Sequence, residues 1–568
     1  MNSTEQLTPQ NNASYVRGDQ SAMLAETTVS KFFSQCVAKY GDQNAVVFTQ
    51  QNIRWTWHQL SERVDDLASG LLAAGIEKGD RVGIWSPNRY EWLLTQFATA
   101  RVGAILVNIN PAYRTHELEH ALKKVEVKML ICADQFKTSQ YLSMLAELVP
   151  ELATAVPGEL QSTALPALKH VVRMGTEKSP GMQNFNQLEQ LGEPHHRAML
   201  EVIGQTFLSS DAINIQFTSG TTGSPKGATL SHKNIVNNAR FTAQAMLLTQ
   251  SDTLCIPVPL YHCFGMVLGV LACVSVGACM VFPNESFDPA STMAAVTRER
   301  CTALHGVPTM FIAMLQHPDF AANDFASLRT GIMAGAPCPI ETMKEVIAKM
   351  NLREITIAYG MTETSPVSFQ SATDDPIEMR VSTVGRIQPH LEVKIIDSTG
   401  ETVALNVTGE LCTKGYSVMK GYWNDQEQTE GSIVDGWMHT GDLATIDERG
   451  YCKIVGRIKD MLIRGGENIY PREIEEFLFT HPKIQEVQVF GVPDSKFGEE
   501  VATWIVLKAG EQASAEEIRE YCKGKISHYK IPRYVRIVTT LPMTVTGKPQ
   551  KFLMRAAMVE ELGLERSN

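Results

Sequence analysis

The sequence predicts an α/β protein with a large N-terminal domain of mixed, mostly parallel sheets with flanking helices, followed by a small α+β C-terminal domain. Up to about residue 455, short apolar runs bounded by turn residues alternate with helical patterns, which is typical of βαβ units. After residue 456, helical and strand patterns follow one another without that alternation. The chain has 568 residues, which is too long for one ordinary domain.

The elements of the large domain can be placed by their patterns. We expect strands at 81–87, 104–110, 127–134, 213–217, 252–259 and 301–308, and helices at 88–103, 118–124 and 231–248. Ser231 is suited to cap the last of these helices. The uncharged run 264–282 is nominally long enough to cross a membrane. Because Gly277 interrupts it before a β-branched segment, we interpret the run as a short helix followed by a buried strand.

The C-terminal segment predicts a smaller unit of its own. We expect helices at 473–482 and 514–526, and strands at 485–494, 501–510 and 534–538. Ser514 and Glu517 have the spacing of a capping box. We place the domain boundary near GRIKD, residues 456–460. The chain then divides into a flexible polar lead-in (1–30), an N-terminal domain (31–456) and a C-terminal domain (457–568).

Composition narrows the classes of partner and compartment. The formal net charge is −11 without a long basic run, which disfavours a nucleic-acid partner or an anionic membrane surface. Peripheral membrane contact stays open. None of the eleven cysteines forms a C-x-x-C pair, which argues against a zinc cage or a disulfide framework and favours a reducing, cytoplasmic location. The first 26 residues lack the apolar stretch of a secretory signal.

The segment FTSGTTGSPKGATLSH, residues 217–232, predicts a phosphate-binding loop. A strand pattern precedes it and a helix pattern follows it, where α/β sheets usually bind ligands. Its glycines let backbone N–H groups approach an anion, its hydroxyls add donors, and Lys226 adds a positive charge. The segment is neither a Walker A loop nor a nucleophile elbow. The alternative is a flexible surface loop rich in glycine.

Five further motifs share one resemblance. They are AYGMTETSPV (358–367), GELCTKGYSVMKGYW (409–423), MHTGDLA (438–444), GRIKDMLIRGGENIYPREIE (456–475) and TVTGKPQK (544–551). Together with the glycine-rich loop, in this order, they resemble the signature motifs of the adenylate-forming (AMP-binding) superfamily, in its acyl-CoA synthetase branch. The resemblance runs from about residue 30 to 560. It implies ATP-dependent formation of an acyl-adenylate, followed by attack of a thiol.

The resemblance also implies which residues contact ATP and CoA. One of the implied residues, Lys459, lies at the hinge between the two domains, and the others are implied to bind ATP or CoA. The full set is Thr218, Ser219, Gly220, Thr221, Thr222, Gly223, Lys226, Gly335, Ala336, Pro337, Tyr359, Gly360, Thr362, Asp442, Arg457, Lys459, Gly465 and Gly466. In similar enzymes the loop wraps the β- and γ-phosphates, the tyrosine faces the adenine, and the aspartate and arginine hold the ribose. The glycine pair lines the pantetheine channel. Singly, several of these residues are also common in solvated turns.

Four residues are implied to be catalytic: Lys548, Lys226, Thr362 and Glu363. The resemblance implies that Glu363 holds Mg²⁺, a hard cation for which one carboxylate plus phosphates suffices. It implies that Lys548 reaches the carboxylate and the α-phosphate during adenylation. Rotation of a mobile C-terminal domain about Lys459 would then exchange Lys548 for the Arg464–Pro471 loop. The alternative for Lys548 is a solvated lysine of the tail.

The substrate pocket is expected around His262, Gly335 and Gly360. The segment PLYHCFGM, residues 259–266, has no carboxylate to pair with an ammonium group, so the acid is expected to lack one. Apolar segments at 265–273 and 305–315 favour a medium- or long-chain fatty acid, with an aromatic acid second. They could equally be ordinary core, and His262 a core histidine.

The expected partners are small molecules: a fatty acid, ATP and CoA. One alternative is a ligase that loads a free-standing acyl carrier protein, and another is an aryl or other carboxylic acid–CoA ligase. A third is a degenerate member that binds without catalysis. The sequence leaves the oligomeric state open, with a dimer as one option.

Overall fold

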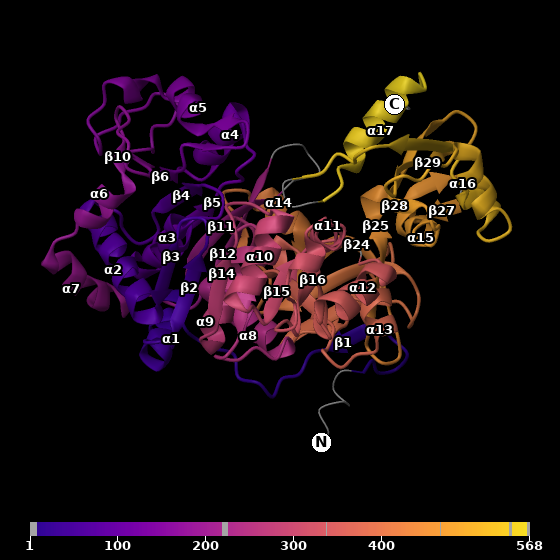
Figure 1. Cartoon of the computed structure of the whole chain (residues 1–568), viewed down its shortest axis with the longest axis horizontal. Coiled ribbons are helices and arrows are strands. Elements are labelled where there is room, and N and C mark those ends of the chain that lie inside the picture. Colours follow the sequence, from indigo (N-terminus) through magenta and orange to yellow (C-terminus); the bar gives the residue numbers. More distant parts are fainter. Residues whose placement is uncertain (1–7, 219–224, 337, 466, 545–547, 565–568) are drawn as a thin grey trace.

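The computed structural model describes residues 8–218, 225–336, 338–465, 467–544 and 548–564. The described chain forms four main sheets with helices packed around them (Figure 1). The helices are α1 (Val29–Tyr40), α2 (Trp57–Ala73), α3 (Tyr90–Val102), α4 (Thr115–Lys124), α5 (Tyr141–Leu148), α6 (Phe185–Gln190), α7 (Pro194–Gly204), α8 (His232–Ala245), α9 (Ala272–Val276), α10 (Pro289–Glu299), α11 (Pro308–Leu315), α12 (Ile340–Met350), α13 (Ile377–Ser382), α14 (Gln426–Ser432), α15 (Pro471–Leu478), α16 (Ala515–Cys522) and α17 (Lys551–Glu561).

An eight-stranded sheet is built mainly from residues 81–231. Its order is β10 (Gln183–Asn184), β9 (His170–Arg173), β6 (Met129–Cys132), β4 (Arg81–Trp85), β5 (Ile105–Asn108), β11 (Ala212–Thr218), β12 (Lys226–Ser231) and β22 (Gly421–Tyr422). The strands are parallel from β10 to β11, and the last two pairings are antiparallel. Every residue of α3 from Glu91 to Val102 is buried, as expected for a helix enclosed by protein on all sides.

A nine-stranded sheet lies beside it. Its order is β19 (Arg386–Ile387), β18 (Val367–Gln370), β17 (Glu354–Gly360), β16 (Thr330–Ala334), β15 (Ala303–Gly306), β13 (Thr253–Cys255), β14 (Cys279–Phe282), β2 (Asn44–Phe48) and β3 (Ile53–Thr56). The strands from β17 to β2 are parallel. The prediction of mostly parallel sheets is therefore confirmed for these two sheets.

A third, antiparallel sheet was not predicted. Its order is β1 (Tyr15–Arg17), β20 (Leu391–Ile396), β21 (Gly409–Gly415), β24 (Trp437–Ile446) and β23 (Ile433–Val434), with β25 (Cys452–Arg457) also paired to β24. Strand β1 corrects the expectation of a flexible lead-in over residues 1–30. Because Val16 is 1% exposed and β1 pairs with β20, this part of the lead-in is an edge strand of the sheet.

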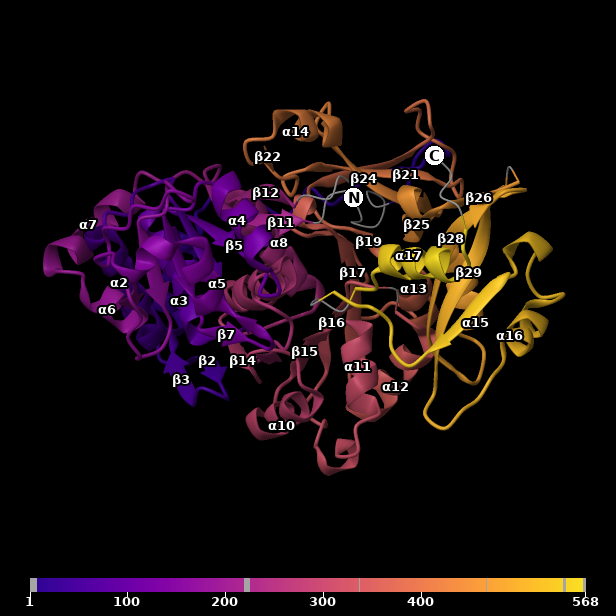
Figure 2. The ribbon, with the colours of Figure 1, turned by 90° about the horizontal axis from the view of Figure 1, so that it is seen from above.

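The C-terminal sheet has a hydrophobic cluster on each face. Its order is β27 (Glu467–Ile469), β26 (Leu462–Arg464), β29 (Gly498–Leu507) and β28 (Ile484–Asp494), with β30 (Tyr534–Val538) beside β29. Alternate residues of β28 and β29 meet α15 and α16 on one face and α17 on the other. Figures 1 and 2 show this unit at one end of the molecule. The domain division near residues 456–460 remains our proposal.

Most local predictions are confirmed, with three informative differences. The run after His262 is a π-helix, Phe264–Leu271, followed by α9 and β14 as expected. No helix among the described residues is long and apolar enough to span a bilayer. Ser514 does cap α16, but Glu517 does not complete a capping box, since its carboxylate accepts from Lys483 Nζ at 2.6 Å. Strand β12 is the third difference and belongs to the site.

Candidate active site

The two ends of the glycine-rich loop are fixed by a β-hairpin. Strand β11 ends at Thr218, β12 begins at Lys226, and these two residues are register partners. We expected the loop to lead directly into a helix, but the six residues of β12 intervene before Ser231 caps α8. This stretch is short and begins within the glycine-rich segment, so its strand pattern was hidden. The predicted residues Ser219, Gly220, Thr221, Thr222 and Gly223 lie outside the described residues.

Lys226 lies at the mouth of this hairpin beside two groups from β22 and α14. Its Nζ donates a hydrogen bond to Gln428 Oε1 and lies 5.1 Å from the centre of the Tyr422 ring. The amide and the aromatic face hold the ammonium without neutralising it. Lys226 is therefore a positioned cation at the end of the loop that we predicted to hold phosphates.

Glu363 meets the start of the loop. It lies on a 3₁₀ turn, Thr362–Thr364, directly after β17, and is 5% exposed. Its Oε1 accepts hydrogen bonds from Thr218 Oγ1 and from the Tyr422 hydroxyl, both at 3.0 Å. Both bonds end on Oε1, so within the described part of the chain Oε2 stays available to a cation. A carboxylate in this state fits the oxygen ligand that Mg²⁺ prefers.

Tyr359, Asp442 and Arg457 form a second polar cluster. Asp442 and Arg457 are register partners across β24 and β25, and Arg457 Nε donates to Asp442 Oδ1 at 3.0 Å. The Tyr359 hydroxyl donates to the other oxygen, Oδ2. Burial, followed by the charge of Asp442, raises the pKa of Tyr359 well above its usual value, so the phenol remains protonated. The structure thus brings together Tyr359, which the resemblance implies to face the adenine, and Asp442 and Arg457, which it implies to hold the ribose.

Two glycines permit tight turns where the central strands end. Gly335 follows β16 with φ of +89°, a left-handed conformation that glycine adopts without strain. A Cβ on Gly360, at the end of β17, would lie 1.7 Å from the carbonyl oxygen of Pro366, so a side chain cannot fit there. Ala334 and Ala358 are register partners, which places Gly335, Ala336 and Tyr359 at one edge of the sheet. Pro337 lies outside the described residues.

His262 precedes the π-helix and is a neutral hydrogen-bond donor. Its Nδ1 accepts from the Phe264 N–H at 3.2 Å, which leaves the ring proton on Nε2. Burial, followed by the positive charge of Lys548, lowers the pKa of His262 to about 3. The ring is therefore uncharged at neutral pH, and His262 is within electrostatic reach of Lys548.

Lys548 belongs to the C-terminal segment but interacts electrostatically with residues that precede that segment. Its surface stays more than a third exposed, yet protein atoms around it desolvate the ammonium and lower its pKa. Arg457 lowers that pKa further, while the carboxylates of Glu363 and Asp442 offset part of the shift. Lys548 is therefore within electrostatic reach of both polar clusters.

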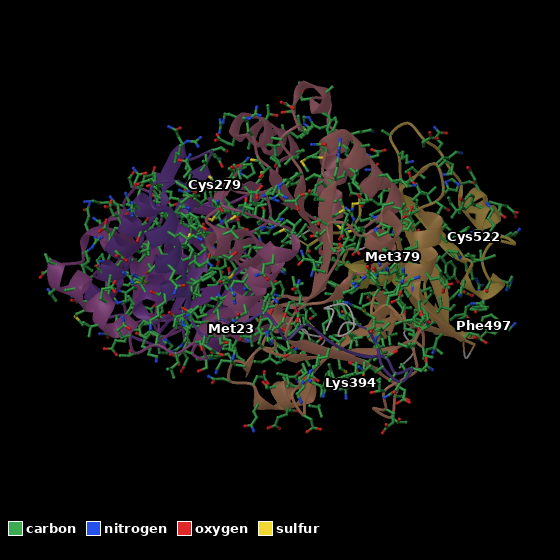
Figure 3. All side chains as sticks on the ribbon, turned by 90° about the horizontal axis from the view of Figure 1, so that it is seen from below. Met23, Cys279, Met379, Lys394, Phe497 and Cys522 are labelled. Carbon is green, nitrogen blue, oxygen red and sulfur yellow. The ribbon has the colours of Figure 1, made fainter. Side chains whose placement is uncertain are left out.

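The predicted hinge residue follows Arg457 by two residues, and the glycine pair belongs to the C-terminal unit. Lys459 is exposed on a 3₁₀ turn, Ile458–Asp460, between β25 and β26. Gly465 donates its N–H to the carbonyl of Phe497 at 2.9 Å, within the C-terminal unit. Figure 3 shows Phe497 at the outer edge of the molecule. The structure does not join Gly465 to Glu363, and Gly466 lies outside the described residues.

Sequence reasoning missed two residues of the site. Tyr422 lies in the motif GELCTKGYSVMKGYW, but nothing in the pattern of that motif assigned its hydroxyl to Glu363. Gln428 lies in α14 and carries no motif at all. Only the pairing of β12 with β22 brings both beside Lys226.

Comparison with known proteins identifies the family of this chain. Family models of the AMP-binding enzyme and of the AMP-binding enzyme C-terminal domain match residues 33–423 and 473–548. YngI of Bacillus subtilis (strain 168) is 51% identical over 96% of this chain and 100% of its own. The mitochondrial medium-chain acyl-CoA ligase ACSF2 of Danio rerio is 48% identical over 97% of this chain and 91% of its own.

A solved structure has a similar fold. The anthranilate CoA ligase AuaEII in complex with anthranoyl-AMP superposes with a TM-score of 0.84 at 25% identity, covering 96% of this chain and 99% of that one. The fold, the ordered motifs and the family matches lead to one conclusion. This chain belongs to the AMP-binding enzyme family, as an AMP-forming acyl-CoA synthetase.

Proposed function

We propose that this enzyme activates a medium- or long-chain fatty acid with ATP and transfers the acyl group to CoA. The fatty-acid carboxylate attacks the α-phosphate of ATP, which forms an acyl-adenylate and releases pyrophosphate. The thiol of CoA then attacks the acyl carbon, which forms the thioester and releases AMP. One observation carries the proposal: Lys548, from the C-terminal segment, lies within electrostatic reach of Glu363, Asp442 and Arg457.

In this proposal the chain's own residues first neutralise charge. The reacting carboxylate and triphosphate are both anions, so catalysis requires cations that are already in position. Lys226 would bind the β- and γ-phosphates, and Lys548 would bind the carboxylate and the α-phosphate as the new bond forms. Lysine suits both places because its ammonium is a compact point charge.

Glu363 would hold Mg²⁺ through Oε2, while Thr218 and Tyr422 fix its other oxygen. When bound, the ion would supply positive charge to the phosphate oxygens. Asp442 would accept hydrogen bonds from the ribose, with Arg457 and Tyr359 holding both of its oxygens in place.

The acyl preference is supported by the apolar helix that follows His262 and by the names of relatives. All eight residues of the π-helix Phe264–Leu271 are buried and none is charged. Relatives from several vertebrates are named medium-chain acyl-CoA ligases, which favours the shorter end of the range. The likeness to an anthranilate CoA ligase makes an aryl acid the second candidate. We also propose a cytoplasmic location. All eleven cysteines are free thiols, which suits a reducing compartment, and two of them, Cys279 and Cys522, lie far apart in the molecule (Figure 3).

Product analysis tests the proposal directly. The enzyme is incubated with ATP, Mg²⁺, CoA and a panel of fatty and aromatic acids, and mass spectrometry measures AMP and acyl-CoA. We expect AMP and acyl-CoA in equal amounts, with the highest yield for medium-chain acids. Acyl-adenylate without acyl-CoA would instead favour a carrier-protein acceptor. If no acid in the panel gave AMP, the result would contradict the proposal.

A further inference from the structure

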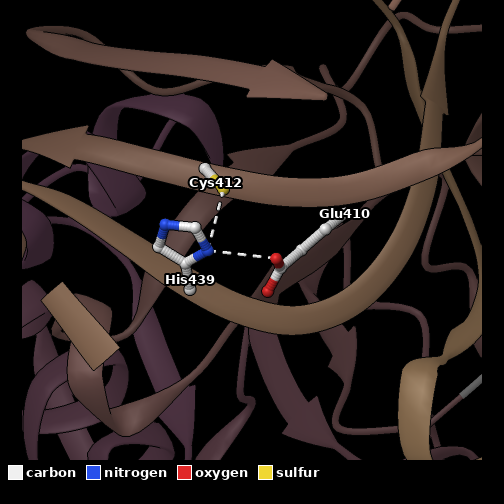
Figure 4. A group of neighbouring side chains, drawn as sticks. All are labelled: Glu410, Cys412 and His439. Carbon is white, nitrogen blue, oxygen red and sulfur yellow. Dashed lines mark hydrogen bonds and ion pairs between the residues drawn. The ribbon is translucent and has the colours of Figure 1, made fainter. Parts of the chain in front are cut away.

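Three side chains on the antiparallel sheet place a thiol, an imidazole and a carboxylate together. Glu410 and Cys412 lie two residues apart on β21, and Cys412 is the register partner of His439 on β24. His439 Nδ1 lies 3.0 Å from Glu410 Oε2 and 3.7 Å from Cys412 Sγ (Figure 4). Within the described residues this is the one group of three potential ligands whose atoms all lie within 4.8 Å of one another.

We propose that Glu410, Cys412 and His439 form a binding site for a divalent cation of the zinc class, with water as the fourth ligand. Thiolate, imidazole and carboxylate are the ligands that Zn²⁺ takes, and three protein ligands plus water is a common set. One thiolate and one carboxylate balance the two positive charges of the ion. Mg²⁺ and Ca²⁺ prefer oxygen ligands, so the thiol and imidazole select against them.

The distances leave little rearrangement to be made. Bonds of about 2.3 Å to sulfur and about 2.0 Å to nitrogen in a tetrahedral site hold these two atoms about 3.5 Å apart. The observed separation of Sγ and Nδ1 is 3.7 Å, which is close to that value. Because both strands are paired along their length, the backbone positions of the ligands are set by the sheet rather than by a loop.

A backbone hydrogen bond orients Glu410, and two of the three proposed ligands are reachable from solvent. Glu410 Oε1 accepts a hydrogen bond from the Gly441 N–H at 3.1 Å, which orients the carboxylate and leaves Oε2 toward His439. The side chains of His439 and Glu410 are 28% and 20% exposed, so a hydrated ion can reach them, while Cys412 is buried. A supporting hydrogen bond of this kind is typical of metal-binding carboxylates.

Binding would exchange protons for the ion without any redox step. Zinc binds the thiolate form of cysteine, so formation of the metal–sulfur bond breaks the S–H bond of Cys412 and releases its proton to solvent. Coordination through Nδ1 of His439 requires a neutral imidazole with its proton on Nε2.

The bound ion would also steady the turn that carries Asp442. Glu410 would share its two oxygens between the ion and the amide of Gly441, one residue before Asp442. Sequence spacing gave no signal for this site, because no C-x-x-C pair exists and His439 joins the other two only through strand pairing. The site is separate from Glu363 and does not depend on the proposed acid substrate.

Cobalt titration of the full chain tests the site, since Co²⁺ takes the same ligands and gives a visible spectrum. The protein is stripped with a chelator and titrated with Co²⁺ in excess Mg²⁺. We expect one equivalent to produce a thiolate-to-metal charge-transfer band and the strong visible bands of a tetrahedral ion. One equivalent of Zn²⁺ should abolish both. Cobalt held by Glu363 would give no thiolate band, so the two sites are distinguishable.

Variants assign the ligands. Cys412→Ser should lose the charge-transfer band, and His439→Gln should weaken Co²⁺ binding at least tenfold. Cys279→Ser, at a half-buried cysteine on β14, should keep the wild-type spectrum. Should Cys412→Ser fail to fold, His439→Gln decides the matter, because unchanged Co²⁺ affinity in that variant would overturn the proposal. No thiolate band in the wild type, or a band that persists in Cys412→Ser, would each overturn it as well.

Discussion

Thr218 and Glu363 are 145 residues apart in the sequence and are joined by a hydrogen bond of 3.0 Å between Oγ1 and Oε1. Thr218 is the last residue of β11, in the eight-stranded sheet, and Glu363 follows β17, in the nine-stranded sheet. The bond therefore ties the first residue of the predicted phosphate-binding loop to the carboxylate proposed to hold Mg²⁺. Tyr422 adds a second bond to the same oxygen.

Tyr422→Phe should weaken the use of Mg-ATP without unfolding the protein. The change removes one hydrogen bond to a buried carboxylate, worth about 1.5 kcal/mol, or roughly tenfold in kcat/KM for ATP. Steady-state kinetics at varied Mg-ATP measure it, with Tyr521→Phe as a control. The Tyr521 hydroxyl contacts Thr480 on the exposed face of the C-terminal unit. Equal losses in both variants would contradict a special role for Tyr422.

Lys548→Ala should block the first half-reaction and spare the second. Loss of one preorganised charge at the transition state costs about 10²- to 10³-fold in rate. Pyrophosphate exchange measures adenylation, and acyl-CoA formation from synthetic acyl-adenylate measures thioester formation. Lys523→Ala, which removes an exposed lysine paired with Glu520, serves as the matched control. Full exchange activity in Lys548→Ala would refute the catalytic assignment.

The pKa of Lys548 gives a prediction about pH. Desolvation and Arg457 lower this pKa, and only the protonated ammonium neutralises charge, so adenylation should fall as pH rises through the lowered value. The alkaline limb of the exchange rate should therefore begin below the usual lysine range, about pH 10.4. Lys548→Arg keeps the charge to higher pH, so any residual exchange should lose this limb. An unchanged limb in Lys548→Arg would assign it to another group.

The sequence could predict the parallel sheets because their strands are continuous apolar runs between turn residues. It missed β1 and β12, which are short, polar in part and stabilised by pairing with distant strands. The same reason explains the site. Motifs identified Glu363, Asp442 and Lys548, whereas Gln428 and the cluster of Cys412 and His439 depend on strand pairing that no local pattern contains.

Lys459→Pro should separate the two half-reactions in the opposite sense from Lys548→Ala. Lys459 is exposed on the 3₁₀ turn between β25, in the large part, and β26, in the C-terminal sheet. Proline fixes φ near −65° and would restrict rotation of the backbone at this point. The structure already has Lys548 near Glu363, so a locked hinge leaves adenylation possible. We expect pyrophosphate exchange within about twofold of wild type and a loss of acyl-CoA formation of roughly tenfold or more.

Lys459→Ala is the matched variant, because it removes the same side chain but leaves φ free. It should retain both half-reactions, which separates the backbone effect from the loss of charge. Gly465 and Phe497 are hydrogen-bonded within the C-terminal unit and would rotate together with it, so holding that unit in its present position should impair only the second step. Equal loss of exchange and acyl-CoA formation in Lys459→Pro would mean that residue 459 supports the fold and is not a hinge.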